Sequence, residues 1–409
     1  MKKLFIAFIS IFLISPIMAQ QAANYDEDKV PSYTLPAILE EGQSIALWEK
    51  QKRAATLAIF ESDVYGKTDL KGVKTSFRIA NQDNEALNGK AIRKEIICTM
   101  ERDGKQHSFS LLLYTPKAVS KAPVFLGLNF YGNHTLSTET GISISKNWVP
   151  NKEAFFIENN KATETSRGVR AYRWPIEKII DRGYGLANIY CGDLDPDFDD
   201  GLKNGIHSIL GETTMGTIGA WAVGLSKAMD YLETDNDVDA KNVAVFGHSR
   251  LGKAALWASA QDPRFKMTIS NESGCGGAAL SKREYGETVE VINTRFPHWF
   301  TTKFKDYNSN EAALPIDQHQ LLALIAPRAL YVATAEGDQW SDPRGQYLSL
   351  YHASKLYQAY GFDKIPKASP AINKSQQIGP LGYHNRSGKH EVMPIDWDNY
   401  LDFADKHLK

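Results

Sequence analysis

The sequence predicts an α/β protein with a mostly parallel central sheet covered by helices on both faces. Segments with the pattern of strands alternate with segments of helical spacing along most of the chain. The strand segments are apolar throughout, whereas a strand with one solvent-exposed face would alternate between apolar and polar residues. Uniformly apolar strands joined by helices are typical of a parallel sheet buried on both faces.

Each element is expected from a local pattern. The pair Asp103-Gly104 favours a tight turn, so the flanking segments 93–102 and 107–114 are expected to form a hairpin. Short apolar runs predict buried strands at 123–130, 184–190, 242–246, 265–269 and 329–335. Apolar residues at helical spacing predict helices at 45–60, 217–232, 251–260, 320–324, 346–360 and 397–407.

The same patterns suggest how the chain is organised. Residues 20–90 are polar and rich in turns, and we interpret them as an N-terminal extension that packs on a domain formed by residues 91–409. Within that domain, the aromatic-rich segment 276–314 interrupts the alternation and is interpreted as a loop insertion over the strand ends. Ligands of such sheets bind beyond the carboxyl ends of the strands, so residues just after each strand are the candidates for a site.

Residues 1–19 have the pattern of a cleaved secretory signal. Lys2 and Lys3 precede an apolar run at 4–17, and the small residue Ala19 follows. The run is too short to span a bilayer comfortably, and an uncleaved anchor is the alternative interpretation. We expect a secreted or periplasmic protein without stable membrane insertion.

Composition and charge exclude several classes of protein. The 409 residues carry 47 basic and 48 acidic side chains, and this balance provides no global field to attract nucleic acid. The three cysteines, Cys98, Cys191 and Cys275, form neither a disulfide framework nor a CxxC zinc pair, and we interpret them as buried thiols, with one bridge left open. The acidic run 193–200 lacks the central glycine of an EF-hand loop and is interpreted as a solvated loop.

The strongest functional signal is the segment 243–258, VAVFGHSRLGKAALWA. A buried strand leads into a turn around Ser249, and a helix begins at once. A sharp strand-to-helix turn presents the serine of a nucleophile elbow, although Gly252 comes one place later than GxSxG requires. Gly247 to Lys253 also fits a phosphate-binding loop, but Ala254 lacks the hydroxyl that would hold magnesium. A structural serine at a helix N-terminus is the third interpretation.

A serine hydrolase of this kind needs an acid after a later strand and then a histidine, in the order Ser, acid, His. Ser249, Asp338 and His390 stand in that order. A neutral histidine takes the serine proton, and a carboxylate orients the histidine. Glu272, just after the strand 265–269, is a second candidate for the acid.

Two further residues compete for these roles. His384 is the alternative base, on a loop before the last helix, but His390 lies closer to that helix. Asp342 is an alternative acid, but it is followed by Pro343, and this pair more plausibly starts a helix.

Several long motifs resemble the glucuronoyl methylesterases, carbohydrate esterase family 15, and the bacterial branch most of all. The resemblance covers most of residues 90–407. The late glycine of the elbow is the normal form in that family. The other motifs are LNFYGNHT (128–135), NESGCGG (271–277), REYGETVEVIN (283–293), FPHWF (296–300), DQWSDPRG (338–345) and YHNRSGKHEVMPIDW (383–397).

The resemblance implies a fold, an activity and a set of roles. The fold is the α/β-hydrolase fold, a three-layer sandwich with loop insertions over the carboxyl ends of the strands. The activity is that of a serine esterase, a carboxylic ester hydrolase that acts on esters of (4-O-methyl-)glucuronic acid linking glucuronoxylan to lignin. Matched position by position, the roles are nucleophile for Ser249, base for His390, oxyanion stabiliser for Arg250, acid for Glu272 or Asp338, and sugar binding for Lys253, Glu287 and Trp340.

The sequence also leaves other functions open. One is a related hydrolase, such as a xylan acetyl esterase, and another is a non-catalytic carbohydrate-binding protein on a hydrolase scaffold. We expect no cofactor and no metal, because the chain has no HExxH motif and no cluster of His and Cys. We expect a monomer with no nucleic-acid partner.

Overall fold

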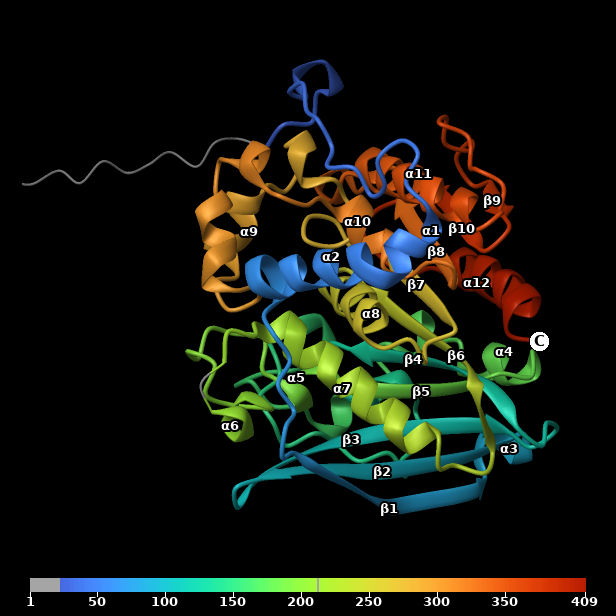
Figure 1. The fold of residues 1–409 in the computed structure, drawn as a ribbon. Helices are drawn as coiled ribbons and strands as arrows, with labels where there is room; N and C mark the ends of the chain where they lie inside the picture. Colours follow the sequence, from blue (N-terminus) through green and yellow to red (C-terminus); the bar gives the residue numbers. More distant parts are fainter. Residues whose placement is uncertain (1–22, 212) are drawn as a thin grey trace, which may run out of the picture.

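The computed structural model describes residues 23–211 and 213–409, so the predicted signal segment 1–19 lies outside the described residues. The described residues form one ten-stranded sheet with the order β1-β2-β3-β5-β4-β6-β7-β8-β10-β9 (Figure 1). The central strands β5, β4, β6, β7, β8 and β10 pair in parallel, and the outer strands pair antiparallel. The predicted α/β class with a mostly parallel sheet is confirmed.

The strands are β1 (Lys74–Glu85), β2 (Ala91–Arg102), β3 (Lys105–Pro116), β4 (Ala122–Asn129), β5 (Gly185–Tyr190), β6 (Val238–His248), β7 (Met267–Asn271), β8 (Ala329–Ala335), β9 (Ser375–Ile378) and β10 (Leu381–Arg386). The helices are α1 (Ile45–Leu47), α2 (Arg53–Phe60), α3 (Ala86–Gly89), α4 (Ile176–Asp181), α5 (Cys191–Leu194), α6 (His207–Leu210), α7 (Thr217–Leu232), α8 (Arg250–Gln261), α9 (Val289–Arg295), α10 (Gln318–Ala323), α11 (Pro343–Ala359) and α12 (Pro394–His407).

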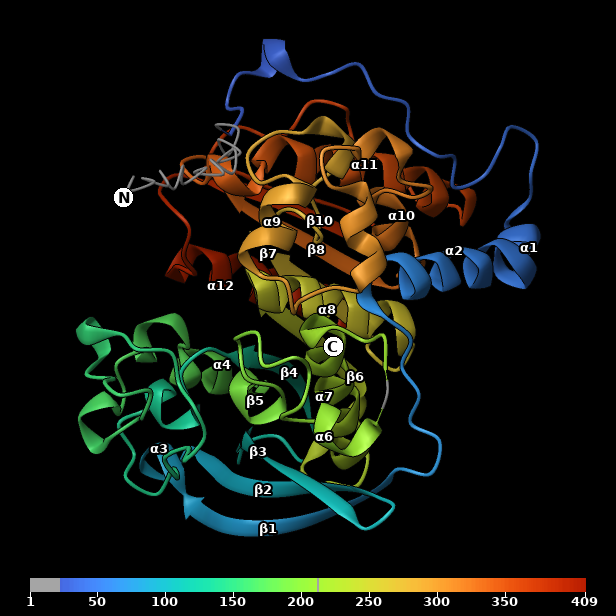
Figure 2. The ribbon, with the colours of Figure 1, turned by 90° about the vertical axis from the view of Figure 1, so that its left-hand side faces the viewer.

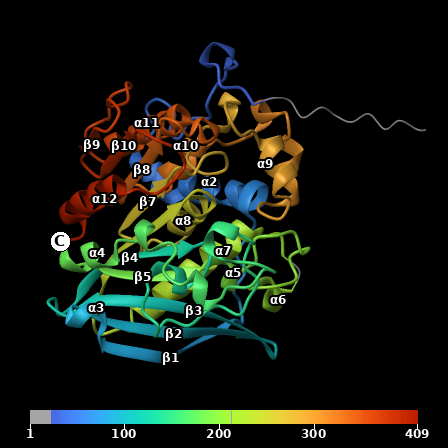
Figure 3. The same cartoon turned by 180° about the vertical axis from the view of Figure 1, so that it is seen from behind.

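The sheet separates two apolar cores. Along β6, Val243 and Val245 belong to one core and Ala244 and Phe246 to the other, because successive side chains of a strand point to opposite faces. The first core includes residues of α7 and α8, and the second includes residues of α4 and α12 (Figures 1 and 3). This arrangement is the three-layer sandwich of the α/β-hydrolase fold.

The N-terminal segment packs against the helix layer that contains α7 and α8. Figure 2 shows α2 beside α10, which comes much later in the chain. Arg53 of α2 donates hydrogen bonds to the carbonyl oxygens of Ala260 and Leu324, at 2.8 and 3.0 Å. The division of the chain at residue 90 stays a prediction, and the structure adds that β1, which comes before residue 90, pairs with β2 of the same sheet.

Most of the predicted elements are present, and three strands were missed. The hairpin around Asp103-Gly104 is formed by β2 and β3. The missed strands are β1, β9 and β10. Much of β1 is solvent-exposed and polar, and β10 carries His384 and other polar residues, so neither has an apolar run. His384 was expected on a loop and instead lies in β10, because hydrogen bonds to the neighbouring strand β8 hold a polar segment in the sheet.

The described residues contain no helix long and apolar enough to cross a membrane. Cys98, Cys191 and Cys275 are all free and buried, as the interpretation of buried thiols requires. The segment 276–314 holds α9 and several short 3-10 turns between β7 and α10.

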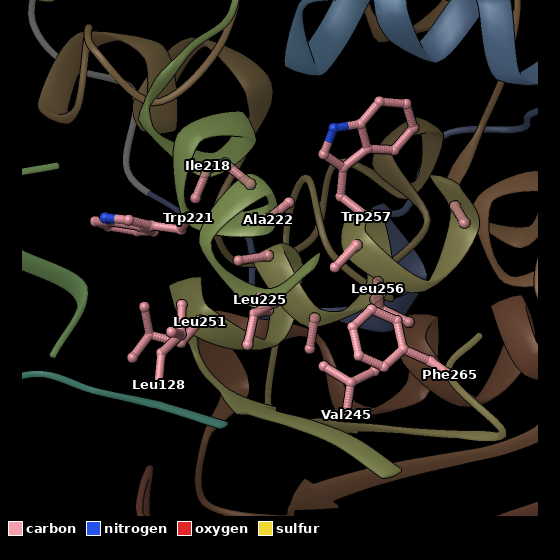
Figure 4. Close-up of a cluster of buried hydrophobic side chains, with 14 of the residues drawn as sticks. Leu128, Ile218, Trp221, Ala222, Leu225, Val245, Leu251, Leu256, Trp257 and Phe265 are labelled. Atoms are coloured by element: carbon pink, nitrogen blue, oxygen red, sulfur yellow. The ribbon is translucent and has the colours of Figure 1, made fainter. Parts of the chain in front are cut away.

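Helix α8 packs against both the sheet and helix α7. Figure 4 shows Leu256 and Trp257 of α8 in one cluster with Trp221 of α7 and Val245 of β6. All four side chains are fully buried. Since α8 begins directly after Ser249, this packing fixes the turn that precedes it.

We therefore expect Leu256→Ala to lower the free energy of unfolding by about 2–5 kcal/mol, because the truncation leaves a cavity that the packed core cannot fill. Urea unfolding followed by circular dichroism measures the loss. Ile372→Ala is the matched control: it shortens an aliphatic side chain that is 38% exposed and should cost less than about 0.5 kcal/mol. Equal losses in the two variants would contradict this description of the core.

Candidate active site

Ser249 occupies a strained turn between β6 and α8. Its backbone has φ 59° and ψ −131°, in the left-handed half of conformational space that residues other than glycine rarely adopt. Its N–H donates to the carbonyl oxygen of Asn271 at 2.9 Å. The strand, sharp turn and helix expected from the sequence are all present.

Two glycines make room for this turn. A Cβ atom on Gly247 would lie 2.0 Å from the carbonyl oxygen of Leu251, a contact that no side chain can relieve. A Cβ atom on Gly252 would lie 3.0 Å from the carbonyl oxygen of Gly247 and 3.0 Å from Cβ of Ser273. The second glycine of the motif stands at position 252 for a steric reason, because that is where the chain next comes close to neighbouring atoms.

His390 follows β10 and lies against two carboxylates. Its Nδ1 is 2.7 Å from Oδ2 of Asp338 and 3.0 Å from Oε2 of Glu272. Asp338 follows β8 and Glu272 follows β7, so neighbouring parallel strands bring both acids to one edge of the sheet. Both candidate acids therefore contact the same ring nitrogen, which carries at most one proton.

This arrangement shifts two pKa values. Burial alone would lower the pKa of His390, but hydrogen bonds and charge from Asp338 and Glu272 outweigh it and raise the pKa to about 9. Burial raises the pKa of Glu272 to about 7, although His390 and Arg386 both favour its ionised form. Arg386 donates to Oε1 of Glu272 at 2.6 Å, and the Glu391 N–H donates to its other oxygen at 3.1 Å.

The two competing residues have structural partners of their own. His384 is buried, with Nε2 2.7 Å from Oδ1 of Asp396 and Nδ1 2.9 Å from the hydroxyl of Tyr331. Both of its ring nitrogens are thus occupied away from Ser249. Asp342 caps α11 by accepting from the Gly345 N–H at 2.8 Å, as expected for a residue that starts this helix.

His248 places the turn beside the His390 ring. The ring centroids of His248 and His390 are 4.5 Å apart. Nδ1 of His248 is 2.5 Å from Oδ1 of Asn271. Burial lowers the pKa of His248 well below its ordinary value, and the nearby charge of Arg173 adds to the effect. Because His248 directly precedes Ser249, this contact puts the serine and His390 at the same edge of the sheet.

Arg250, the residue after Ser249, is held by an acid that the sequence analysis did not identify. Its Nη1 forms an ion pair with Asp197, and its guanidinium lies 4.7 Å from the centroid of the Trp299 ring. Oδ1 of Asp197 accepts from Trp299 Nε1 at 2.8 Å and lies 3.2 Å from Nε2 of His298. Burial alone would raise the pKa of Asp197, but Arg250 and the two ring donors hold it at about 2.

The interpretation of 193–200 as a solvated loop is therefore wrong for residues 193–197, whereas Asp199 is exposed as that interpretation expects. Asp193 and Asp195 are also buried, and Asp195 accepts a hydrogen bond from the Thr217 hydroxyl at 2.6 Å. The loop turns inward because its carboxylates have partners from distant parts of the chain. The spacing of residues in the sequence does not indicate such partners, because about a hundred residues separate Asp197 from Trp299. The FPHWF motif, which includes Trp299, was the one available signal.

Phe130 links Arg250 to the two histidines. The Arg250 guanidinium is 5.7 Å from the centroid of the Phe130 ring, and that ring meets His248 edge-on at 6.2 Å. The side chain of His390 is 40% exposed, so the group is accessible from solvent. Ser249, Arg250 and His390 thus lie around one small region at the carboxyl ends of β6, β7 and β8.

A second group of residues lies beside this region and consists of Lys253, Glu287 and Trp340. Nζ of Lys253 donates to the carbonyl oxygen of Ser273 at 2.6 Å. Burial lowers the pKa of Lys253, and Glu287 opposes this effect. Burial raises the pKa of Glu287, while Lys253 and a hydrogen bond from Trp340 favour its charged form. The structure therefore brings together all three residues expected to bind sugar.

Within the described chain, one group has atoms suited to hold a metal ion: His248, Glu272 and His390 bring possible ligand atoms within 4.8 Å of one another. Arg386 already pairs with Glu272 at 2.6 Å, and Nδ1 of His390 is already hydrogen-bonded to Asp338 at 2.7 Å. The one carboxylate of this group, Glu272, is therefore already paired with a side chain, and the expectation of no metal stays a prediction.

Comparisons with known proteins fit this geometry. The family model "Glucuronyl esterase, fungi" matches residues 201–361. The chain is 47% identical to carbohydrate esterase MZ0003, from an unknown prokaryotic organism, over 94% of this chain and 92% of the relative.

Two solved structures are similar over nearly the whole chain. One is a promiscuous CE15 esterase from a marine bacterial metagenome, with 47% identity and a TM-score of 0.88, covering 94% of this chain and 100% of that one. The other is a glucuronoyl esterase from Solibacter usitatus, with 44% identity and a TM-score of 0.86, covering 93% of this chain and 100% of that one.

We expect Asp338→Asn to lower the pKa of His390 from about 9 toward its ordinary value, because the variant removes a negative acceptor that stabilises the protonated ring. The measurement is an NMR titration of the His390 ring proton, assigned with His390→Gln. Asp363→Asn, which changes an exposed acid, serves as the control. An unchanged His390 titration in Asp338→Asn would show that this carboxylate does not act on the ring.

Proposed function

Because the chain belongs to carbohydrate esterase family 15, the glucuronoyl esterases, we propose that it hydrolyses esters of 4-O-methylglucuronic acid through an acyl-enzyme on Ser249. The observation that carries this proposal is the position of His390, whose Nδ1 meets Asp338 at 2.7 Å and Glu272 at 3.0 Å beside the strained turn of Ser249. Its other ring nitrogen is then free to accept the serine proton.

The first half of the reaction forms the acyl-enzyme. Oγ of Ser249 attacks the C6 carbonyl carbon of the uronate ester while His390 takes its proton. The carbonyl oxygen becomes an oxyanion, and Arg250 stabilises it with its guanidinium and its backbone N–H. That N–H belongs to the first turn of α8, where N–H groups have no acceptor within the helix. His390 then gives its proton to the departing alcohol.

The second half restores the enzyme. His390 removes a proton from water as the water oxygen attacks the acyl carbon. His390 then returns this proton to Oγ of Ser249 as the ester bond breaks, and the uronic acid is released. Two carboxylates on Nδ1 of His390 stabilise the imidazolium in both halves. Neutral His390 is the active form, so kcat/KM rises with pH as the ring loses its proton near its pKa of about 9.

Lys253, Glu287 and Trp340 would hold the sugar. The ammonium and carboxylate provide a donor and an acceptor for ring hydroxyls, and the indole face packs against a pyranose ring. We further infer that the natural substrates are glucuronoxylan–lignin esters, that residues 1–19 direct export, and that the enzyme acts as a monomer.

Ser249→Ala should reduce kcat/KM on methyl glucuronate by about 10⁴-fold or more, because it removes the nucleophile of a residue set that works as a unit. The variant should keep the wild-type melting temperature and lose labelling by a serine-directed phosphonate. Acetylated xylan is the comparison substrate. Equal rates in wild type and variant would refute the mechanism, and a clear preference for acetyl esters would favour a xylan acetyl esterase.

Glu272→Gln and Asp338→Asn should each leave partial activity, because the other carboxylate still contacts Nδ1 of His390. The double variant should lose more than the product of the two single losses, as expected for groups that substitute for one another. Steady-state kcat/KM values for the four proteins measure this coupling, with Glu336→Gln, an exposed acid near Asp338, as the control. Strictly multiplicative losses would mean that the two acids act independently.

A further inference from the structure

Arg250, a cation predicted to meet the substrate, already has a carboxylate beside it. Arg250 forms its ion pair with Asp197, whose carboxylate is held in turn by Trp299 at 2.8 Å. The charge of Glu287 acts on buried Lys253. Arg250 therefore presents little net positive charge to a ligand, because the Asp197 carboxylate balances its guanidinium.

This balance matters for the proposed reaction, on which the inference rests. The substrate is a neutral ester, whereas the product is a uronic acid that is ionised at neutral pH, because carboxyl groups ordinarily have pKa values near 4. A guanidinium without a counter-ion binds carboxylates through charge-assisted and often bidentate hydrogen bonds. Hydrolysis thus creates the kind of anion that an unpaired Arg250 would retain.

We propose that Asp197 keeps Arg250 from trapping the uronate product and so makes product release fast. The Asp197 carboxylate occupies Nη1 of Arg250, and its negative charge repels a second carboxylate. The oxyanion of the reaction is affected differently, because its covalent bond to Ser249 holds it against Arg250. Asp197 is therefore a positioning residue that lets Arg250 stabilise the tethered oxyanion and release the free anion.

The test compares binding of an anion and of a neutral ligand of the same shape. Titration calorimetry is done on Ser249→Ala, which cannot turn the ester over, with glucuronate and with methyl glucuronate as the probes. Adding Asp197→Asn should tighten glucuronate binding about tenfold or more, while methyl glucuronate affinity changes less than about twofold. Asp199→Asn, an exposed acid on the same loop, should change neither affinity.

A purely structural role for Asp197 predicts a different result, in which both ligands bind more weakly. That result, or equal gains for both ligands, would overturn the proposal. A third measurement adds Arg250→Ala to the protein that carries Ser249→Ala and Asp197→Asn. This change should abolish the increase in glucuronate affinity.

A comparison without any change at Asp197 covers the case in which Asp197→Asn does not fold. Ser249→Ala alone should bind glucuronate no tighter than methyl glucuronate, and tighter binding of the anion would overturn the proposal. Turnover of methyl glucuronate by the wild-type enzyme is measured in parallel. Its absence would refute the proposed function, whereas normal turnover with the wrong binding pattern would refute this inference alone.

Discussion

The rest of the site depends on the left-handed backbone of Ser249. With φ at 59°, the chain leaves β6 and enters α8 within a single residue. The missing side chain of Gly247 makes this turn possible, and that of Gly252 relieves a tight approach beside it. The turn has two consequences. It lifts the serine to the edge of the sheet, and it starts a helix whose first turn carries Arg250 and Lys253. Because β7 pairs in parallel with β6 and β8 pairs in parallel with β7, the ends of β7 and β8 deliver Glu272 and Asp338 to the same edge.

Paired charge is the second organising feature. Unpaired buried charges are costly, and several buried charges near the site lie in ion pairs that connect it to the scaffold. Arg386 joins Glu272 to Asp396, at 2.6 and 3.0 Å, and Asp396 in turn contacts His384. Asp197 joins the turn at Ser249 and Arg250 to the segment 276–314, which carries Trp299. These partners hold Glu272 and Arg250 in place, and the carboxylates of Asp338 and Glu272, in contact with His390, set how strongly its ring holds a proton.

Sequence reasoning succeeded where the physical signal is local. Apolar runs identified β8 and α7, and the glycines around Ser249 identified the turn. It failed where the signal is distant: the polar strand β10 is held by pairing with β8, and Asp197 turns inward because of Arg250 and Trp299. The choice between Glu272 and Asp338 was left open, and the structure shows why, since both acids contact one nitrogen. The order of residues along the chain predicts which side chains can come into contact, but it does not predict how many of them contact the same atom.

The most direct test of this account is a crystal structure of the enzyme after reaction with a serine-directed phosphonate, whose tetrahedral phosphorus resembles the intermediate. The account predicts a covalent bond from phosphorus to Oγ of Ser249, with one phosphoryl oxygen within hydrogen-bond distance of Arg250 and the imidazole of His390 within reach of another oxygen. An adduct on a different residue, or one at Ser249 with the guanidinium of Arg250 turned away from the phosphoryl group, would contradict it.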